Sequence, residues 1–502
     1  MKNISFLFLF FVSLFSFAQV KPTFSEKLNK KYKFIQFNGA IGDKIVFNHA
    51  NSVKASRTKL GVFDQKTFTI IKDEVSLLIS GNEIDDEIDF VRSYVVKNGI
   101  IALGTSYNSR KNVRDFYIKK LNSTLEVEKN WTKIHSIEGK GSKNSSWRML
   151  NQPGSDDLPL VIELEARNES EQRIQVIFLG IDGSKISNQE ISLPYSPRNL
   201  DVERVFRFPN QKIALVTEYR GRNRSETKDQ DQTTNDQLLT FEFDPKDGSI
   251  SEHRIKSEDY KVMGHFPVAN DNQLDLITLL TKKSKFTGIG TSSLNTDSKI
   301  MTPLQPSLFS KEMISKLEDA SRTRLAKRGK ESLSSKFYIF KVLNNPQTKE
   351  NYIICQYYYS YQQCTTTSGG VTNCRTYYVY KDILVIATNS KGDINWVNLI
   401  PHSFTSSNYL SQGDLGIPFL KNGTLNFFFD REVIDPSKKS KRNNFGPTLI
   451  SMNGSEPPKR NPIDLTNKSR VYISDATGIL VDESLFLIGF EKRNKLFIRL
   501  DL

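Results

Sequence analysis

The sequence is poor in the residues that metal sites and redox centres use. Its 502 residues include 3 cysteines, 5 histidines and 3 tryptophans. So few cysteines exclude a disulfide-stapled small domain or an array of zinc ribbons. The histidines are scattered singly without an H-E-x-x-H motif, and the chain has no P-loop and no G-x-S-x-G nucleophile motif. We therefore predict no catalytic residue, no metal ligand and no cofactor.

The acidic segments offer no better metal site. Residues 229–240 begin like a calcium-binding loop, but Thr234 stands where that loop needs glycine and Thr240 where it needs glutamate. The acidic run at residues 83–89 can be read as a calcium site, but it is more typical of a solvated loop between repeats. Neither segment supports a predicted cation site.

Long apolar runs are also missing, apart from one at the N-terminus. Lys2 precedes an apolar run at residues 4–15, and the small residues Ser16 and Ala18 follow it. This pattern is typical of a secretory signal peptide, here residues 1–18, and the run is too short to span a membrane. We expect an exported protein without a transmembrane segment. It would lie in the periplasm, in an outer-membrane-associated complex of a Gram-negative-type bacterium, or outside the cell.

The charge balance is basic. Lysine and arginine number 70 against 56 acids, a net charge of +14 that falls by one when Lys2 is removed with the signal peptide. Two basic clusters are candidate contacts for a protein or an anionic glycan, although each is also typical of a solvated loop. They are Arg322, Arg324, Lys327 and Arg328, and then Lys438, Lys439, Lys441 and Arg442. Export argues against nucleic acid as a partner.

Short alternating strands and turn residues dominate the chain after residue 31, which predicts an all-β fold. One strand type recurs at intervals of about 60 residues, as an apolar run that ends in an Asx or Gly turn. Its copies lie at residues 60–64, 116–122, 176–182, 239–244, 383–389, 448–453 and 496–501, with a weaker copy at 288–297.

The repeat favours a single β-propeller over residues 31–502, with seven or eight four-stranded blades and eight preferred. Residues 19–30 are a candidate strand that closes the ring and removes its open sheet edges. Two β-sandwiches in series are the alternative, but no linker rich in proline, serine and glycine divides the chain. Residues 303–330 interrupt the pattern with a helical period, which begins at Ser310 as N-cap and ends near Gly329.

A hairpin with two cysteines follows this insertion. Cys364 and Cys374 flank a polar tip between tyrosine-rich strands. If they face each other, Tyr361 lies opposite Tyr377 and Tyr358 opposite Tyr380. We predict a Cys364–Cys374 disulfide, which suits an oxidising compartment. Residues 355, 357, 359, 361, 379 and 383 would share the opposite, more apolar face, so that Cys355 is a buried free thiol.

One turn carries a distant family resemblance. Residues 389–396, from Asn389 through Gly392 and Asp393 to Trp396, are similar to a degenerate Asp-box turn of sialidase-type propellers, with the glycine and aspartate in reversed order. Such turns also resemble those of secreted bacterial propeller-like proteins. The resemblance implies a propeller architecture and no catalytic residue, because Asp-boxes are structural.

Three functions remain open from the sequence, and one of them is a passive carbohydrate-binding module. The first is a non-enzymatic binding or scaffold protein of the cell envelope, with a protein or glycan partner. The second is a glycan hydrolase or lyase with carboxylates in the central channel, for which Asp89, Asp201 and Glu203 in expected inner strands are candidates. The absence of recognisable catalytic motifs favours the first.

Overall fold

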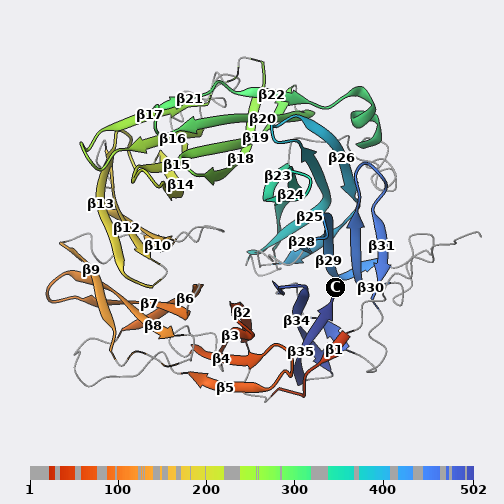
Figure 1. The fold of residues 1–502 in the computed structure, drawn as a ribbon, viewed down its shortest axis with the longest axis horizontal. Coiled ribbons are helices and arrows are strands. Elements are labelled where there is room, and N and C mark those ends of the chain that lie inside the picture. The colour runs from red at the N-terminus through yellow and green to blue at the C-terminus, as the bar shows by residue number, and fades with distance from the viewer. Residues whose placement is uncertain are drawn as a thin grey trace, which may run out of the picture.

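The computed structural model describes residues 22–28, 34–50, 58–75, 88–96, 99–122, 126, 128, 130–139, 147–149, 157–164, 171–180, 182–197, 199–219, 238–255, 257, 259–282, 285–317, 337–366, 372–407, 416–433, 445–463, 471–473, 478–491 and 494–502. These residues form eight antiparallel sheets that follow one another around a ring in chain order (Figure 1). The chain is an all-β propeller of eight blades, which confirms the preferred prediction.

Blades 1 to 4 each have four strands in simple sequential order, with the first strand innermost (Figure 1). They are β2 (Phe34–Ile41), β3 (Lys44–Ala50), β4 (Thr58–Asp64) and β5 (Ile70–Val75) in blade 1, and β6 (Asp89–Val96), β7 (Gly99–Asn108), β8 (Val113–Asn122) and β9 (Thr132–Glu138) in blade 2. Blade 3 has β10 (Trp147–Met149), β11 (Asp157–Leu164), β12 (Gln172–Gly180) and β13 (Lys185–Leu193), and blade 4 has β14 (Leu200–Arg207), β15 (Ile213–Tyr219), β16 (Leu238–Phe243) and β17 (Ile250–Arg254).

Blades 5 to 8 keep this order with additional strands. Blade 5 has β18 (Lys261–Asn270), β19 (Gln273–Lys282), β20 (Lys285–Asn295), β21 (Ile300–Met301) and β22 (Gln305–Leu308), and blade 6 has β23 (Phe337–Asn345), β24 (Glu350–Thr366), β25 (Thr372–Thr388), β26 (Ile394–Ile400) and β27 (Phe404–Ser407). Blade 7 has β28 (Ile417–Lys421), β29 (Thr424–Val433), β30 (Phe445–Met452) and β31 (Lys459–Pro462). Blade 8 has β32 (Val471–Ile473), β33 (Ile479–Val481), β34 (Ser484–Glu491), β35 (Asn494–Asp501) and β1 (Pro22–Phe24).

The core lies between the blades. The middle strands are buried on both faces, as in β16, where every residue is buried, because each sheet packs against a neighbour on either side. Buried apolar residues form eight clusters, and each cluster joins one blade to the next. One of them joins blade 8 to blade 1, so apolar packing continues around the whole ring.

Chain segments from both ends of the sequence build blade 8. Strand β1 pairs with β35 as its outermost strand, with Phe24 opposite Ile498. Beyond it, Ser25 N donates to Phe497 O over 2.9 Å, and Phe497 N donates to Ser25 Oγ over 2.9 Å. Leu28 then enters the cluster between blades 8 and 1, where the ring of Phe497 stacks on Phe63 at 4.3 Å between centroids.

The recurring motif of the sequence is the third strand of each blade and the turn after it. In these turns an Asx side chain accepts hydrogen bonds from backbone N–H groups two or three residues on, as Asp64, Asn295 and Asn389 do. Such Asx turns satisfy donors that the sheet leaves unpaired. The Thr67 and Lys66 hydrogen bonds also lower the pKa of Asp64.

The predicted helical insertion at residues 303–330 contains a strand before its helix. Residues 305–308 form β22, which pairs with β20, and the helix starts at residue 311. Ser310 caps it as expected, since Met313 N donates to Ser310 Oγ over 3.2 Å. Leu317 is buried against blades 5 and 6. Residues 318–330 of the predicted helix lie outside the described residues, as do residues 1–21 with the predicted signal peptide.

Candidate interaction site

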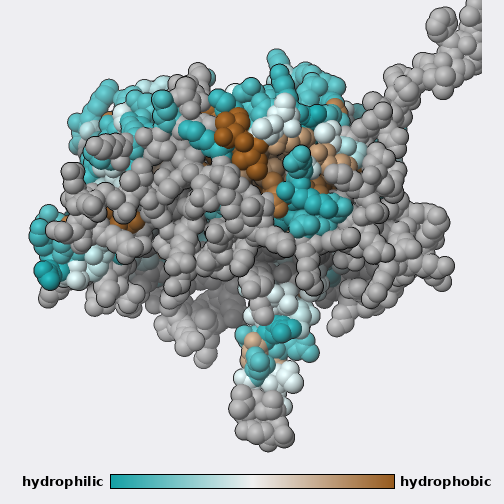
Figure 2. Space-filling view, turned by 90° about the horizontal axis from the view of Figure 1, so that it is seen from below, coloured by the Kyte–Doolittle hydropathy of each residue, from teal (hydrophilic) through white to brown (hydrophobic). Residues whose placement is uncertain are grey.

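The longest described strands, β24 and β25, form a hairpin that continues beyond the body of blade 6. Their inner halves are buried between neighbouring blades, whereas Ser360–Thr366 and Thr372–Arg375 are exposed. Figure 2 shows this end of the hairpin as a narrow projection below the ring. Side chains on the projection are therefore accessible to a binding partner, whereas side chains packed between blades are not.

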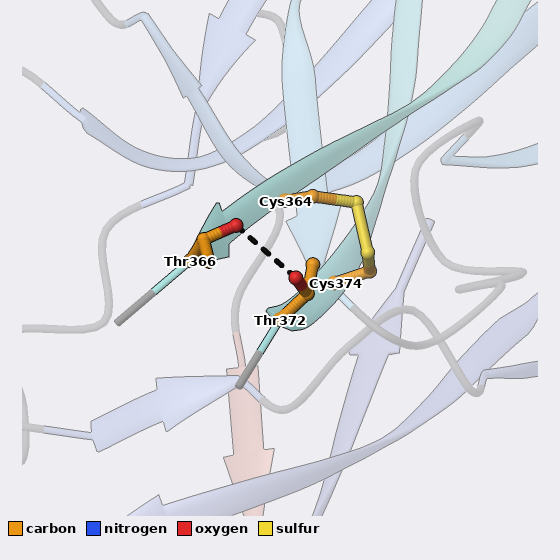
Figure 3. The surroundings of a disulfide bond; sticks show 4 residues. All are labelled: Cys364, Thr366, Thr372 and Cys374. Carbon is orange, nitrogen blue, oxygen red and sulfur yellow. Dashed lines mark hydrogen bonds between the residues drawn. A yellow bond between two sulfur atoms is a disulfide. The ribbon is translucent and has the colours of Figure 1, made fainter. Parts of the chain in front are cut away.

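The predicted disulfide holds the projecting strands together. Cys364 and Cys374 are bonded and lie directly opposite each other, close to a Thr366–Thr372 hydroxyl hydrogen bond of 3.1 Å (Figure 3). The predicted register is also confirmed, with Tyr361 opposite Tyr377 and Tyr358 opposite Tyr380. A cross-link over so short a loop stabilises the hairpin by about 2–3 kcal/mol, by restricting its unfolded state.

Four tyrosines line one face of the hairpin, and we call them the tyrosine strip: Tyr357, Tyr359, Tyr361 and Tyr377. Consecutive ring centroids are 6.0, 6.4 and 5.1 Å apart, and the last pair is stacked with an interplanar angle of 14°. Lys381 Nζ lies 5.3 and 5.1 Å from the ring centroids of Tyr357 and Tyr359. Tyr361 is 45% exposed, so the outer end of the strip is open to solvent.

Arg375 stands at the outer end of the same face. It pairs with Gln363, two positions beyond the Tyr361–Tyr377 pair, and side chains two apart on a strand point to the same side. Arg375 is exposed, whereas Lys381 at the inner end is half-buried. The tyrosine strip thus runs between two cations.

The opposite face carries the disulfide and a second group of tyrosines. The rings of Tyr358 and Tyr378 stack at 6.4 Å, and Tyr338 of β23 meets Tyr358 edge-on at 6.0 Å. Burial raises the pKa of Tyr358. Tyr338 is 53% exposed, so each face of the hairpin shows one well-exposed tyrosine.

A β-bulge separates the projecting hairpin from the body of the blade. Lys381 and Asp382 together stand opposite Tyr357, and the buried Asp382 carboxylate accepts a 3.0 Å hydrogen bond from His402 N. The extra residue shifts the alternation of β25 by one, so that side chains beyond the bulge point to the opposite face of the sheet. Ile383 therefore lies opposite Gln356, and its predicted place on the face of Cys355 is wrong.

Cys355 itself is as predicted: a free thiol on the face opposite the disulfide, fully buried between blades 5 and 6. Burial raises the pKa of its thiol. A reactive cysteine needs an accessible site that favours the thiolate, so Cys355 serves as a packing residue.

Bulges also recur in the innermost strands, where the local sequence pattern carries no signal for them. The first strand of five blades contains one extra residue, namely Asn38, Val91, Glu203, Gly264 and Phe340. Polar side chains beside these bulges join neighbouring inner strands. Asn38 Nδ2 donates to Ser93 Oγ over 2.8 Å, and His265 Nε2 lies 2.9 Å from Glu203 Oε2.

The inner-strand acids predicted as a channel pair are engaged by neighbours. Arg148 of β10 places the same guanidinium nitrogen 2.8 Å from Asp201 and 3.6 Å from Glu163, and it also donates to Val202 O. Glu203 Oε2 lies 2.9 Å from His265 Nε2 of β18. These contacts fasten blades 3, 4 and 5 to one another. The side chain of Asp89 lies outside the described residues.

No three histidine, cysteine or acidic side chains lie close enough to hold a metal ion among the described residues. The calcium-like segment at 229–237 and the acidic residues 83–87 are outside that part of the chain.

The eight basic residues predicted as contacts, in the ranges 322–328 and 438–442, also lie outside the described residues. The structure instead points to two basic residues that are absent from the predicted contacts: Arg375 and Lys381. A signal for them exists in the sequence. Eight of the 18 tyrosines fall within residues 352–380, and residues 351–381 contain no acid.

Within the described residues, no helix has the length and apolar character needed to cross a bilayer. No family model matches the sequence, and no curated protein matches it.

Solved structures resemble the chain only distantly. They include a polysaccharide lyase, Uly1, with 9% identity, 82% of this chain and 89% of that chain covered, and a TM-score of 0.33. The β-propeller domain of the Trilobed protease from Pyrococcus furiosus gives 11% identity, 82% and 93% coverage, and a TM-score of 0.33. Cobalt-substituted Synechocystis ACO has 8% identity, 74% of this chain and 73% of that chain covered, and a TM-score of 0.33. Likenesses this weak carry no argument about activity.

Proposed function

We propose that this chain is a non-enzymatic binding protein of the bacterial cell envelope, which uses the β24–β25 hairpin to hold a protein or glycan partner. The observation that carries the proposal is the projecting, disulfide-tied hairpin with the tyrosine strip on one face. Tyrosine gives a large, rigid contact area at low entropic cost, and it is enriched in recognition surfaces. The ring supplies a fixed base for it.

The cell-envelope location rests on two features. The predicted signal peptide at residues 1–18 directs export, and the Cys364–Cys374 disulfide suits an oxidising compartment. Within this proposal the protein acts in the periplasm, in an outer-membrane-associated complex or outside the cell. The basic clusters at residues 322–328 and 438–442 add long-range attraction for an acidic partner.

A propeller-type glycan hydrolase or lyase is the second candidate. It is favoured by the contact between Glu203 and His265 on inner strands, because a carboxylate beside an imidazole is a common acid–base arrangement. It ranks second because Asp201, Glu163 and Arg148 form one cluster that joins β10 and β11 to β14. Such a cluster accounts for these acids as inter-blade contacts.

The two candidates separate in a co-sedimentation experiment with native envelope fractions. The first variant replaces residues 360–378 with Asn-Gly, which closes the paired Tyr359 and Val379 with a tight turn. The second is Glu203→Gln. We expect the shortened hairpin to bind at least tenfold more weakly and Glu203→Gln to bind like the wild type. Unchanged binding of the shortened variant would refute the proposal, and release of glycan fragments that Glu203→Gln abolishes would establish the enzyme instead.

A further inference from the structure

The tyrosine strip combines two properties that together define a ligand. Its outer end is an aromatic stack, because the rings of Tyr361 and Tyr377 lie 5.1 Å apart and nearly parallel, and Tyr361 remains 45% exposed to a ligand. The face of an aromatic ring carries negative electrostatic potential, so it attracts the polarised C–H groups on the flat face of a sugar. The phenol hydroxyls add hydrogen-bonding partners at the ring edges.

The charged residues on the same face determine which sign of charge a ligand should carry. Arg375 at the outer end and Lys381 at the inner end are the charged residues of β24 and β25 within residues 351–381, which contain no aspartate or glutamate. Six residues of strand separate Tyr357 from Gln363, about 20 Å at roughly 3.3 Å per residue. Two cations at the ends of such a strip match an extended ligand that carries carboxylate or sulfate groups along its length.

The opposite face serves as an internal comparison. It also has stacked tyrosines, Tyr358 and Tyr378, and an exposed Tyr338. Its outer positions are the disulfide and the Thr366–Thr372 pair, which carry no charge. Aromatic rings and cations therefore coincide on only one face of the hairpin.

We propose that the tyrosine strip binds an acidic polysaccharide, with a sugar ring packed against the exposed Tyr361 and acidic groups paired with Arg375 and Lys381. This inference rests on the proposed binding function and names its ligand class. The absence of acids from residues 351–381 favours a polyanion over a neutral glycan, as does the net charge of +14, which falls by only one on removal of the signal peptide.

The test is titration calorimetry of the mature protein with three probes: alginate as a polyuronate, dextran as a neutral glucan, and polyglutamate as an acidic polypeptide. We expect alginate alone to bind well. Tyr361→Ala should weaken alginate binding about tenfold through loss of stacking. Arg375→Gln should weaken it by a similar factor at low salt and by much less at 0.5 M salt, because screening removes the ionic contribution.

Tyr338→Ala is the matched control, because it removes an exposed tyrosine from the uncharged face. It should bind alginate like the wild type, and melting curves confirm that each variant is folded. Equal losses in Tyr338→Ala and Tyr361→Ala, or no alginate binding by the wild type, would overturn the inference. Equal binding of polyglutamate would do so as well, since the strip would then recognise charge alone.

These experiments also distinguish a failure of the polysaccharide inference from a failure of the proposed binding function. If alginate fails but the shortened hairpin still loses the native envelope partner, the binding function stands with a different ligand class. If the hairpin variants bind envelope like the wild type, the binding function itself fails.

Discussion

Removal of the N-terminal strand tests how the ring is closed. A mature protein that begins at residue 30 lacks β1, Ser25 and Leu28, and it exposes the outer edge of β35. Leu28 is 7% exposed, and removal of a buried leucine side chain costs about 2–5 kcal/mol. In the intact chain, Ser25→Ala leaves the buried Phe497 N–H without its hydroxyl acceptor, which costs about 1–3 kcal/mol.

Urea unfolding and size-exclusion chromatography measure the two consequences. The unfolding midpoint should fall, with Leu28→Ala and Ser25→Ala each reproducing part of the loss in the intact chain. The truncated protein should also self-associate, since an open strand edge pairs with other edges. Lys27→Ala is the control, because Lys27 makes an exposed ion pair with Glu491 at 3.4 Å and should cost less than about 1 kcal/mol. A truncated protein that stays monomeric with an unchanged midpoint would refute the closure.

Three further predictions concern buried polar groups. Glu242→Gln should destabilise the protein by about 3–5 kcal/mol in urea unfolding, because it removes the negative charge 2.9 Å from the buried Lys212 ammonium and leaves Asp244 at 4.0 Å as the nearest carboxylate. Glu190→Gln in an exposed pair with Arg173 should cost under about 1 kcal/mol, and similar costs for the two variants would contradict the burial argument. Cys355 should resist iodoacetamide at pH 8 in the folded protein and react in urea, because burial raises the pKa of its thiol; rapid labelling of the folded protein would disprove its buried position. Burial lowers the pKa of His253 below its unfolded value of about 6.5, so the unfolded state binds more protons and the free energy of unfolding falls as pH drops through that value. His253→Gln should reduce this fall in urea unfolding midpoints measured from pH 7.5 to 5. A pH profile unchanged by the substitution would contradict the argument.

Features set by local chemistry were predictable from the sequence. The third strands could be found because each ends in an Asx or Gly turn, and the tyrosine register followed once Cys364 was placed opposite Cys374. Both signals lie within a short stretch of chain.

Features that depend on a partner strand were not predictable. The bulge at Lys381 and Asp382 moved Ile383 to the other face, and nothing in the local pattern marks it. Residues 305–308 belong to the predicted helical insertion, yet they pair with β20. There Gly288 lets the backbone of Ser307 approach so closely that no side chain would fit at position 288. The tyrosine strip combines both cases. Its tyrosines are visible in the sequence, but their alignment with Arg375 and Lys381 depends on the register.

Hydrogen–deuterium exchange of the mature protein with and without alginate tests the central claim most directly, because it reports where on the ring the ligand sits. The account predicts added protection in Ser360–Thr366 and Thr372–Tyr380, with unchanged exchange in the inner strands β14 and β18. Protection concentrated in β14 and β18, around Glu203 and His265, would place the ligand at the centre of the ring and contradict the account.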